Sequence, residues 1–127
     1  TMTSNPRALE VATAVLGSLT PALRANVRER GIEFLEGLRA LQRDFPAAVL
    51  EVHGTGLICS CELDPTTLPV NGKGGVEEQL RLRGLGVIHG GTNALRFTPW
   101  FGITSAEVAM MLDAVRQVIA EAAAAAA

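Results

Sequence analysis

The chain has 127 residues, 48% hydrophobic and only 4% aromatic, which is one domain's length with a core that must be aliphatic. Lys and Arg number 11 against 13 Asp and Glu, and no block of like charge stands out, which argues against nucleic acid or a membrane surface as a partner. No apolar run approaches the roughly 20 residues of a membrane span, and no signal peptide is visible. These features predict a cytoplasmic protein.

Two helices are predicted at the start of the chain. Asn5-Pro6 and Thr20-Pro21 each place a capping residue before a proline at the first helical position. Apolar residues recur at helical spacing after both signals. The second and longer stripe consists of Leu23, Val27, Phe34, Leu35, Leu38 and Leu41. Phe45-Pro46 is expected to end this helix, whose charged opposite face is expected to be solvated.

A β-hairpin is predicted next, because residues 49–53 and 57–63 alternate with a period of two around a His-Gly-Thr-Gly turn. Alternate residues of the second run should line the buried face: Leu57, Cys59, Cys61 and Leu63. Two cysteines at this spacing rarely form a disulfide, and they lack the further ligands of a zinc site. We therefore expect buried thiols in a reducing compartment, and no metal site.

The remaining elements complete an α+β pattern. In order they are a loop at 64–75, a helix at 76–83, a strand at 85–88, a glycine-rich turn at 89–93, a strand from Ala94 and a helix from Ser105. This order predicts a small antiparallel sheet of about four strands with helices packed on one face. The alanine run at 122–127 continues the last helix, forms a linker or stands for unidentified side chains.

The stretch from Ala94 to Thr104 holds the candidate binding residue. Strand alternation directs Leu95 and Phe97 into the core and Arg96 away from it. A guanidinium on a rigid strand suits the bidentate capture of a carboxylate or phosphate, and a structural ion pair is the alternative. Thr104-x-x-Glu107 has the form of a helix capping box.

Other chemically capable residues give weaker signals. Lys73, the only lysine, fails the Walker pattern and is predicted at a loop tip, where flanking glycines do not suit a Schiff-base lysine. His53 and His89 are expected to be strand-edge histidines with ordinary partners. Gly90-Gly91 could present N–H groups to an anion or serve only as a turn. The residues alone predict no complete catalytic group.

Four stretches resemble, in the right order, the C-terminal part of class III pyridoxal-phosphate aminotransferases of the ornithine, acetylornithine and 4-aminobutyrate type. They are the Thr-x-x-x-Asn-Pro at 1–6, the run from Asn26 to Leu41, the Val-x-Gly-x-Gly-Leu pattern with its Glu-Leu ending at 52–63, and the Leu-Arg-Phe-Thr-Pro at 95–99. Two positions depart from the pattern. His53 stands where the family usually has arginine, and Trp100-Phe101 replaces a Pro-Leu type pair.

The resemblance implies the small domain of a fold-type I enzyme, with a connecting helix, at 1–121, followed by the alanine tail at 122–127. It assigns Arg96 to the carboxylate of an amino acid or 2-oxo acid substrate, and Thr1 to the phosphate of pyridoxal 5'-phosphate in the other subunit of a homodimer. The family's Schiff-base lysine precedes the threonine motif. This chain alone is therefore expected to be an inactive fragment, without a catalytic residue, that partners the large cofactor-binding domain. The alternative is a non-catalytic binding or regulatory module of the same fold.

Overall fold

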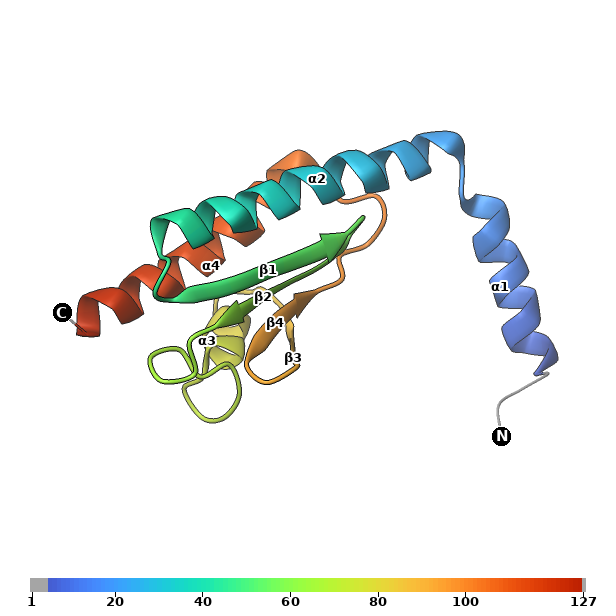
Figure 1. The fold of residues 1–127 in the computed structure, drawn as a ribbon. Helices are drawn as coiled ribbons and strands as arrows, with labels where there is room; N and C mark the ends of the chain where they lie inside the picture. The colour runs from blue at the N-terminus through green and yellow to red at the C-terminus, as the bar shows by residue number, and fades with distance from the viewer. Residues whose placement is uncertain (1–4, 127) are drawn as a thin grey trace.

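A computed structural model describes residues 5–126, which form four helices and a four-stranded antiparallel sheet (Figure 1). The elements are α1 (Pro6–Ser18), α2 (Pro21–Asp44), β1 (Val49–Thr55), β2 (Ile58–Leu63), α3 (Val76–Leu82), β3 (Ile88–Gly90), β4 (Ala94–Phe97) and α4 (Ser105–Ala126). The predicted α+β class and sheet are confirmed. No helix in this range is long and apolar enough to cross a membrane.

The sheet has the strand order β1-β2-β4-β3, so β2 and β4 lie at its centre. Ser60 of β2 pairs with His53 on one side and with Arg96 on the other, and Arg96 pairs in turn with Ile88 of β3. Residues directly opposite one another share a face of the sheet. This register therefore places Arg96 in a row with Ser60 and His53, on the face opposite the core.

Helices α2 and α4 cover the other face of the sheet (Figure 1). The predicted buried residues of β2 are confirmed, since Cys59, Cys61 and Leu63 are each at most 1% exposed. Phe34 of α2 meets Phe97 of β4 edge-to-face, with ring centroids 5.0 Å apart. Such pairs add to the free energy gained by burying the rings. The aliphatic strand face and the helical stripes thus form one core.

A close backbone contact seats α2 on the tip of the β1-β2 hairpin. A Cβ atom on Gly31 would lie 2.3 Å from the carbonyl oxygen of Gly56, so any larger residue at position 31 would force the two elements apart. Gly56 has a φ of 54°, a left-handed conformation that glycine adopts without strain. The hairpin tip is therefore fixed by contact between two backbones.

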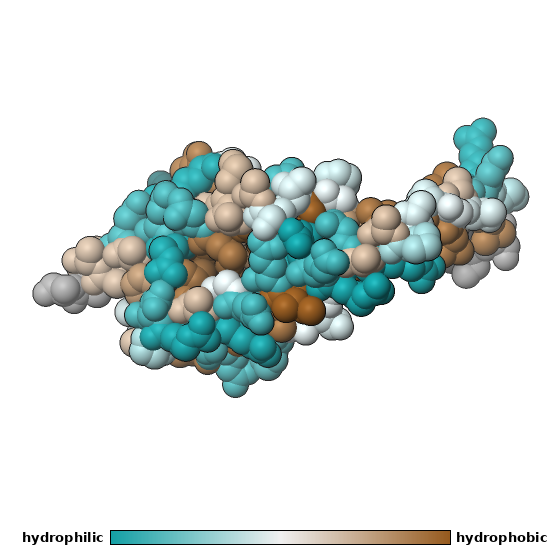
Figure 2. Space-filling view, turned by 90° about the horizontal axis from the view of Figure 1, so that it is seen from above, coloured by the Kyte–Doolittle hydropathy of each residue, from teal (hydrophilic) through white to brown (hydrophobic). Residues whose placement is uncertain are grey.

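The predicted helix starts are confirmed by the caps. Asn5 Oδ1 accepts a hydrogen bond from the backbone N–H of Arg7, and Thr20 Oγ1 accepts one from that of Leu23. The two helices nevertheless differ in packing. Helix α2 buries four residues, whereas α1 buries none and stands apart from the body (Figure 1). Brown hydrophobic groups show at the α1 end of the molecule in Figure 2.

Two strand boundaries differ from the prediction, and the end of the last helix follows one of the predicted alternatives. The strand predicted at 85–88 is β3 at Ile88–Gly90, because the N–H of Leu85 bonds to the carbonyl of Leu80 and keeps the segment on the end of α3. Strand β1 extends to Thr55, so the hairpin turn is the two residues between Thr55 and Ile58. Helix α4 continues through the alanine run as far as Ala126, as the first alternative for that run predicted.

Candidate functional site

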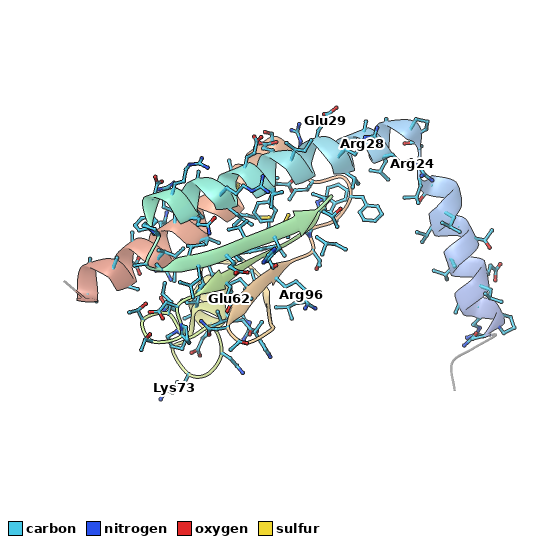
Figure 3. All side chains as sticks on the ribbon, viewed as in Figure 1. Arg24, Arg28, Glu29, Glu62, Lys73 and Arg96 are labelled. Atoms are coloured by element: carbon cyan, nitrogen blue, oxygen red, sulfur yellow. The ribbon has the colours of Figure 1, made fainter. Side chains whose placement is uncertain are left out.

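Arg96 lies on the uncovered face of the sheet, as the alternation predicted. Its neighbours Leu95 and Phe97 are 0% and 1% exposed, while Arg96 itself is exposed. Within residues 5–126 its guanidinium forms neither an ion pair nor a hydrogen bond, although Glu62 lies on the same face (Figure 3). The structural ion pair that was the alternative for Arg96 is therefore not formed in this part of the chain.

The guanidinium of Arg96 is held against the edge strand β3. A Cβ atom on Gly90 would lie 3.0 Å from Nη2 and 3.3 Å from Cζ of Arg96, so the missing side chain at position 90 leaves room for the group. The N–H donors of an arginine form a planar fork that matches the two oxygens of a carboxylate. Arg96 thus combines a fixed backbone with donors that no described residue uses.

Arg96 lines a hollow of about 240 Å³ on this face together with Ser60 and His53. The imidazole Nε2 of His53 lies 2.8 Å from Oε2 of Glu51, and Nδ1 of His89 lies 2.8 Å from Oε2 of Glu77. Both histidines have the ordinary partners that were predicted for them. The hollow therefore offers one uncommitted cation, the hydroxyls of Ser60 and Thr55, and one imidazole already bonded to a carboxylate.

The described residues do not supply a Schiff-base lysine. Lys73, the only lysine of the chain, is exposed at the loop where it was predicted, beside the acidic groups Glu77 and Glu78. Such a lysine needs a desolvated and rigid setting to lower its pKa. Thr1, the candidate for the cofactor phosphate, lies outside the described residues. The free guanidinium of Arg96 has donors that suit a carboxylate, but the described residues do not by themselves form a pyridoxal-phosphate site.

The two cysteines are structural. Both are free and buried, and burial raises the pKa of the Cys59 thiol. Burial, together with the charge of Cys59, raises the pKa of Cys61 to about 12. Since the thiolate is the reactive form, neither thiol is a suitable nucleophile at neutral pH. No cluster of three or more potential metal ligands occurs among the residues that the structure describes.

The loop that follows β4 is tied to α2 by Asn26, which the sequence analysis did not identify. Its Nδ2 donates to the carbonyl oxygens of Phe101 at 2.9 Å and Ile103 at 3.0 Å. An asparagine inside a helix is a weak signal of this role, because its short amide competes for backbone groups. Asn26 thereby sets the position of Trp100 and Phe101, which are 66% and 48% exposed.

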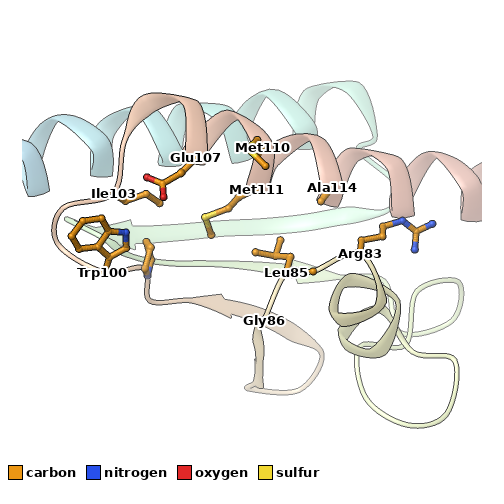
Figure 4. Close-up of a pocket in the computed structure, with 11 residues that line it drawn as sticks. Arg83, Leu85, Gly86, Trp100, Ile103, Glu107, Met110, Met111 and Ala114 are labelled. Carbon is orange, nitrogen blue, oxygen red and sulfur yellow. The ribbon is translucent and has the colours of Figure 1, made fainter.

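A larger hollow of about 340 Å³ lies on the helical side, between α4 and the connection from α3 to β3 (Figure 4). Its polar side chains are already engaged. Arg83 pairs with Glu121, and Glu107 accepts hydrogen bonds from the backbone N–H and the hydroxyl of Thr104. These bonds lower the pKa of Glu107 and confirm the predicted capping box. The charged side chains of this hollow are therefore already engaged within the described residues.

The fold and the free arginine define an α+β domain with a candidate anion site on the open face of its sheet. Residues 1–119 match the family model described as Aminotransferase class-III. The chain belongs to the class-III aminotransferase family, whose members use pyridoxal phosphate. The family resemblance predicted from the sequence is thus confirmed.

Two curated relatives of this chain are acetylornithine aminotransferases. The mitochondrial acetylornithine aminotransferase of Neurospora crassa is 37% identical over 109 residues, covering 85% of this chain and 22% of that protein. The acetylornithine aminotransferase of Thermosynechococcus vestitus is 34% identical over 98% of this chain and 30% of its own length.

Two solved structures share the fold. The N-acetylornithine aminotransferase of Stenotrophomonas maltophilia has a TM-score of 0.74 at 27% identity, covering 90% of this chain and 30% of its own. A lysine aminotransferase from M. tuberculosis has a TM-score of 0.69 at 28% identity, covering 91% of this chain and 24% of its own. The chain spans less than a third of the length of each of these four relatives.

Proposed function

We propose that this chain is the C-terminal small domain of a pyridoxal-phosphate-dependent aminotransferase, which moves an amino group between an amino acid and a 2-oxo acid. Family membership supports the reaction class. The observation that carries the role of this chain is the exposed guanidinium of Arg96, which has no partner in the described residues. Arg96 binds the substrate carboxylate, and Thr1 contacts the cofactor phosphate across a homodimer.

The geometry explains what Arg96 contributes. Pyridoxal phosphate supplies the electron sink for the reaction when it is bound. Arg96 orients the substrate, because a planar fork that holds both carboxylate oxygens fixes which end of the molecule points away from it. The strand fixes the backbone of Arg96, and the missing side chain of Gly90 leaves room for that fork. This chain therefore contributes positioning, and the reacting groups come from the large domain.

The large domain is also the proposed partner of α1. The apolar residues of that helix are largely uncovered, with exposures of 60% for Leu9, 50% for Val15 and 66% for Leu16. A helix whose apolar side meets only water gains little from folding, since most helical stability in proteins comes from packing. Burial against the large domain supplies the missing contact.

Substitution of Arg96 in the full-length enzyme tests the carboxylate role. A hydrogen-bonded charge contributes about 1.5–3 kcal/mol, so Arg96→Ala should raise KM about 10-fold to 100-fold while cofactor absorbance stays unchanged. Arg96→Lys should give a smaller rise, because it keeps the charge and loses the fork. Arg81→Ala is the matched control, since Arg81 is exposed and pairs with Glu77. An unchanged KM in Arg96→Ala would refute the assignment.

Cofactor retention tests the role of Thr1. Thr1→Ala should weaken the binding of pyridoxal phosphate, because it removes a hydroxyl donor to the phosphate. Thr3→Ala in the same motif is the control. The measurement is the cofactor absorbance that remains with the full-length protein after gel filtration. Equal retention by both variants would show that Thr1 has no such role.

A further inference from the structure

The Arg96 hollow has a second and larger one as its neighbour. This neighbour, called here the apolar hollow, has a volume of about 450 Å³ and shares Thr55 and Ile58 with the Arg96 hollow. Ile58 and Ser60 lie two residues apart on β2 and therefore on the same face, about 7 Å from each other along the strand. Ser60 pairs with Arg96. The two hollows are thus neighbours with Thr55 and Ile58 as their common wall, and Arg96 lines one of them.

The apolar hollow has a chemical character of its own. It is lined by Val27, Thr55, Gly56, Leu57, Ile58, Thr98, Pro99 and Phe101, and no charged side chain is among these. Ile58 is 60% exposed and Phe101 48% exposed, so both lining residues keep hydrocarbon surface that the described residues do not cover. Ligand sites in proteins are mostly apolar, with a few placed polar groups that fix orientation, and they commonly enclose 300–1,000 Å³.

Both walls of the apolar hollow are fixed before any ligand arrives. Asn26 holds the Phe101 side through its two hydrogen bonds to the loop carbonyls. The backbone contact between Gly31 and Gly56 holds the hairpin side. A preformed wall reduces the entropy lost when a ligand binds.

We propose that the apolar hollow receives the side chain of the substrate whose carboxylate Arg96 holds. The inference rests on the proposed function and specifies its substrate class, which is an amino acid or 2-oxo acid with an aliphatic or aromatic side chain of several carbons. The strand register supports this, because the backbone row that Arg96 shares with Ser60 lies about 7 Å along β2 from Ile58. Asn26 acts as a positioning residue, since it touches the wall and not the ligand.

The test uses the full-length enzyme, loaded with pyridoxal phosphate, and the acceptors pyruvate, 2-oxobutanoate, 2-oxopentanoate and 2-oxohexanoate. Burial of each added methylene corresponds to about a fourfold gain in kcat/KM along the series. Phe101→Ala should reduce the gain in kcat/KM per added methylene, while kcat/KM for pyruvate stays nearly unchanged. Trp100→Ala is the matched control, because the Trp100 side chain lines the separate hollow beside α4. This control should keep the wild-type gain.

A second pair of variants tests the positioning role. Asn26→Asp keeps the shape of the side chain and removes both donors to the loop, so it should flatten the gain along the series. Gln42→Glu is its control, since Gln42 of the same helix donates to the carbonyl of Leu50 at 2.8 Å, away from the apolar hollow. Both changes remove a bond to the backbone and can lower stability. Only Asn26→Asp should alter the dependence on chain length.

Three outcomes would overturn the proposal, and they are distinguishable. If Phe101→Ala leaves the gain intact while Arg96→Ala lowers kcat/KM for every acceptor, the apolar hollow is not the subsite, although the carboxylate role stands. If Phe101→Ala lowers kcat/KM equally for all acceptors, pyruvate included, the hollow is filled by protein in the full-length enzyme. If Arg96→Ala changes kcat/KM for none of the acceptors, Arg96 does not bind the carboxylate. The proposed subsite, which depends on that role, is then also refuted.

Discussion

The two faces of the sheet are built from alternate residues of the same strands, yet they differ in almost every physical property. On β4 the covered face carries Leu95 and Phe97, which are at most 1% exposed, and the open face carries Arg96. On β2 the covered face carries Cys59 and Cys61. The covered face buries the apolar side chains that stabilise the fold. The open face can therefore carry exposed groups that contribute little to stability.

This division separates the residues that support the fold from those proposed to recognise a ligand. The covered face meets α2 and α4 through tightly packed aliphatic and aromatic groups. The open face keeps a cation without a partner in the described residues beside an apolar hollow. Substitutions on the two faces should therefore affect different measurements, and the comparison can be tested in order of expected effect.

The largest effect is expected on the covered face. Phe34→Ala removes a fully buried ring that contacts Phe97, and such a change costs about 3–5 kcal/mol through lost burial and the cavity left behind. The free energy of unfolding in urea measures it. Ile32→Ala on the same helix is the control, because Ile32 is 60% exposed and its loss should change stability little. Equal losses in both variants would contradict the division between the faces.

The next effect concerns Asn93, the buried polar residue at the edge of the covered face. Its Oδ1 accepts from the N–H of Val70, and its Nδ2 donates to the carbonyls of Leu63 and Leu68. Asn93→Ala leaves these groups buried and unpaired, which costs about 1–3 kcal/mol. Hydrogen exchange at the Val70 amide should accelerate. Asn71→Ala, at an exposed position, should leave that exchange rate unchanged.

A smaller effect is expected at the start of α4 and depends on pH. Hydrogen bonds from Thr104 lower the folded pKa of Glu107 below its ordinary value of 4.5. The stabilisation is therefore present above that value and is lost as the pH falls through the lower folded pKa. Glu107→Gln should weaken the loss of stability on acidification, followed as the urea midpoint between about pH 7 and 3. Glu36→Gln, on the exposed side of α2, should not reproduce this change.

The smallest effect on stability is expected at Arg96 itself. Its side chain forms no ion pair among the described residues, so Arg96→Ala should change the free energy of unfolding by no more than about 0.5 kcal/mol. Thermal unfolding of the same preparations used for kinetics measures this. A loss above about 1 kcal/mol would show that Arg96 supports the fold. The open face would then also contribute to stability, which contradicts the division between the faces.

The sequence predicted the contrast between the faces because strands have a period of two. Leu57, Cys59, Cys61 and Leu63 could face only one way, and Arg96 only the other. The caps of α1 and α2 were predictable for a similar reason, since each depends on residues within one turn. Features that depend only on neighbouring residues, such as strand faces and helix caps, can therefore be predicted from a single sequence.

The parts that escaped prediction depend on contacts between distant residues. The amide of Asn26 reaches a loop 75 positions along the chain, and no local pattern marks such a partner. The apolar hollow arises where a helix, a hairpin and a loop meet. The strand expected from Leu85 begins only at Ile88, because the first residues pack on the end of α3. Sequence reasoning therefore predicted the open-face position of Arg96 but not its surroundings.

The contact between Gly31 and Gly56 has a consequence for how such a site could diversify. Because two backbones touch there, a larger residue at position 31 would displace the hairpin, and the left-handed φ of Gly56 disfavours any other residue at position 56. Ile58 and Phe101, by contrast, carry exposed side chains whose size can change while the frame stays in place. The hairpin tip is thus a fixed point of the backbone beside two positions whose side chains can vary, so a change of acceptor could be made by side-chain exchange without a redesign of the scaffold.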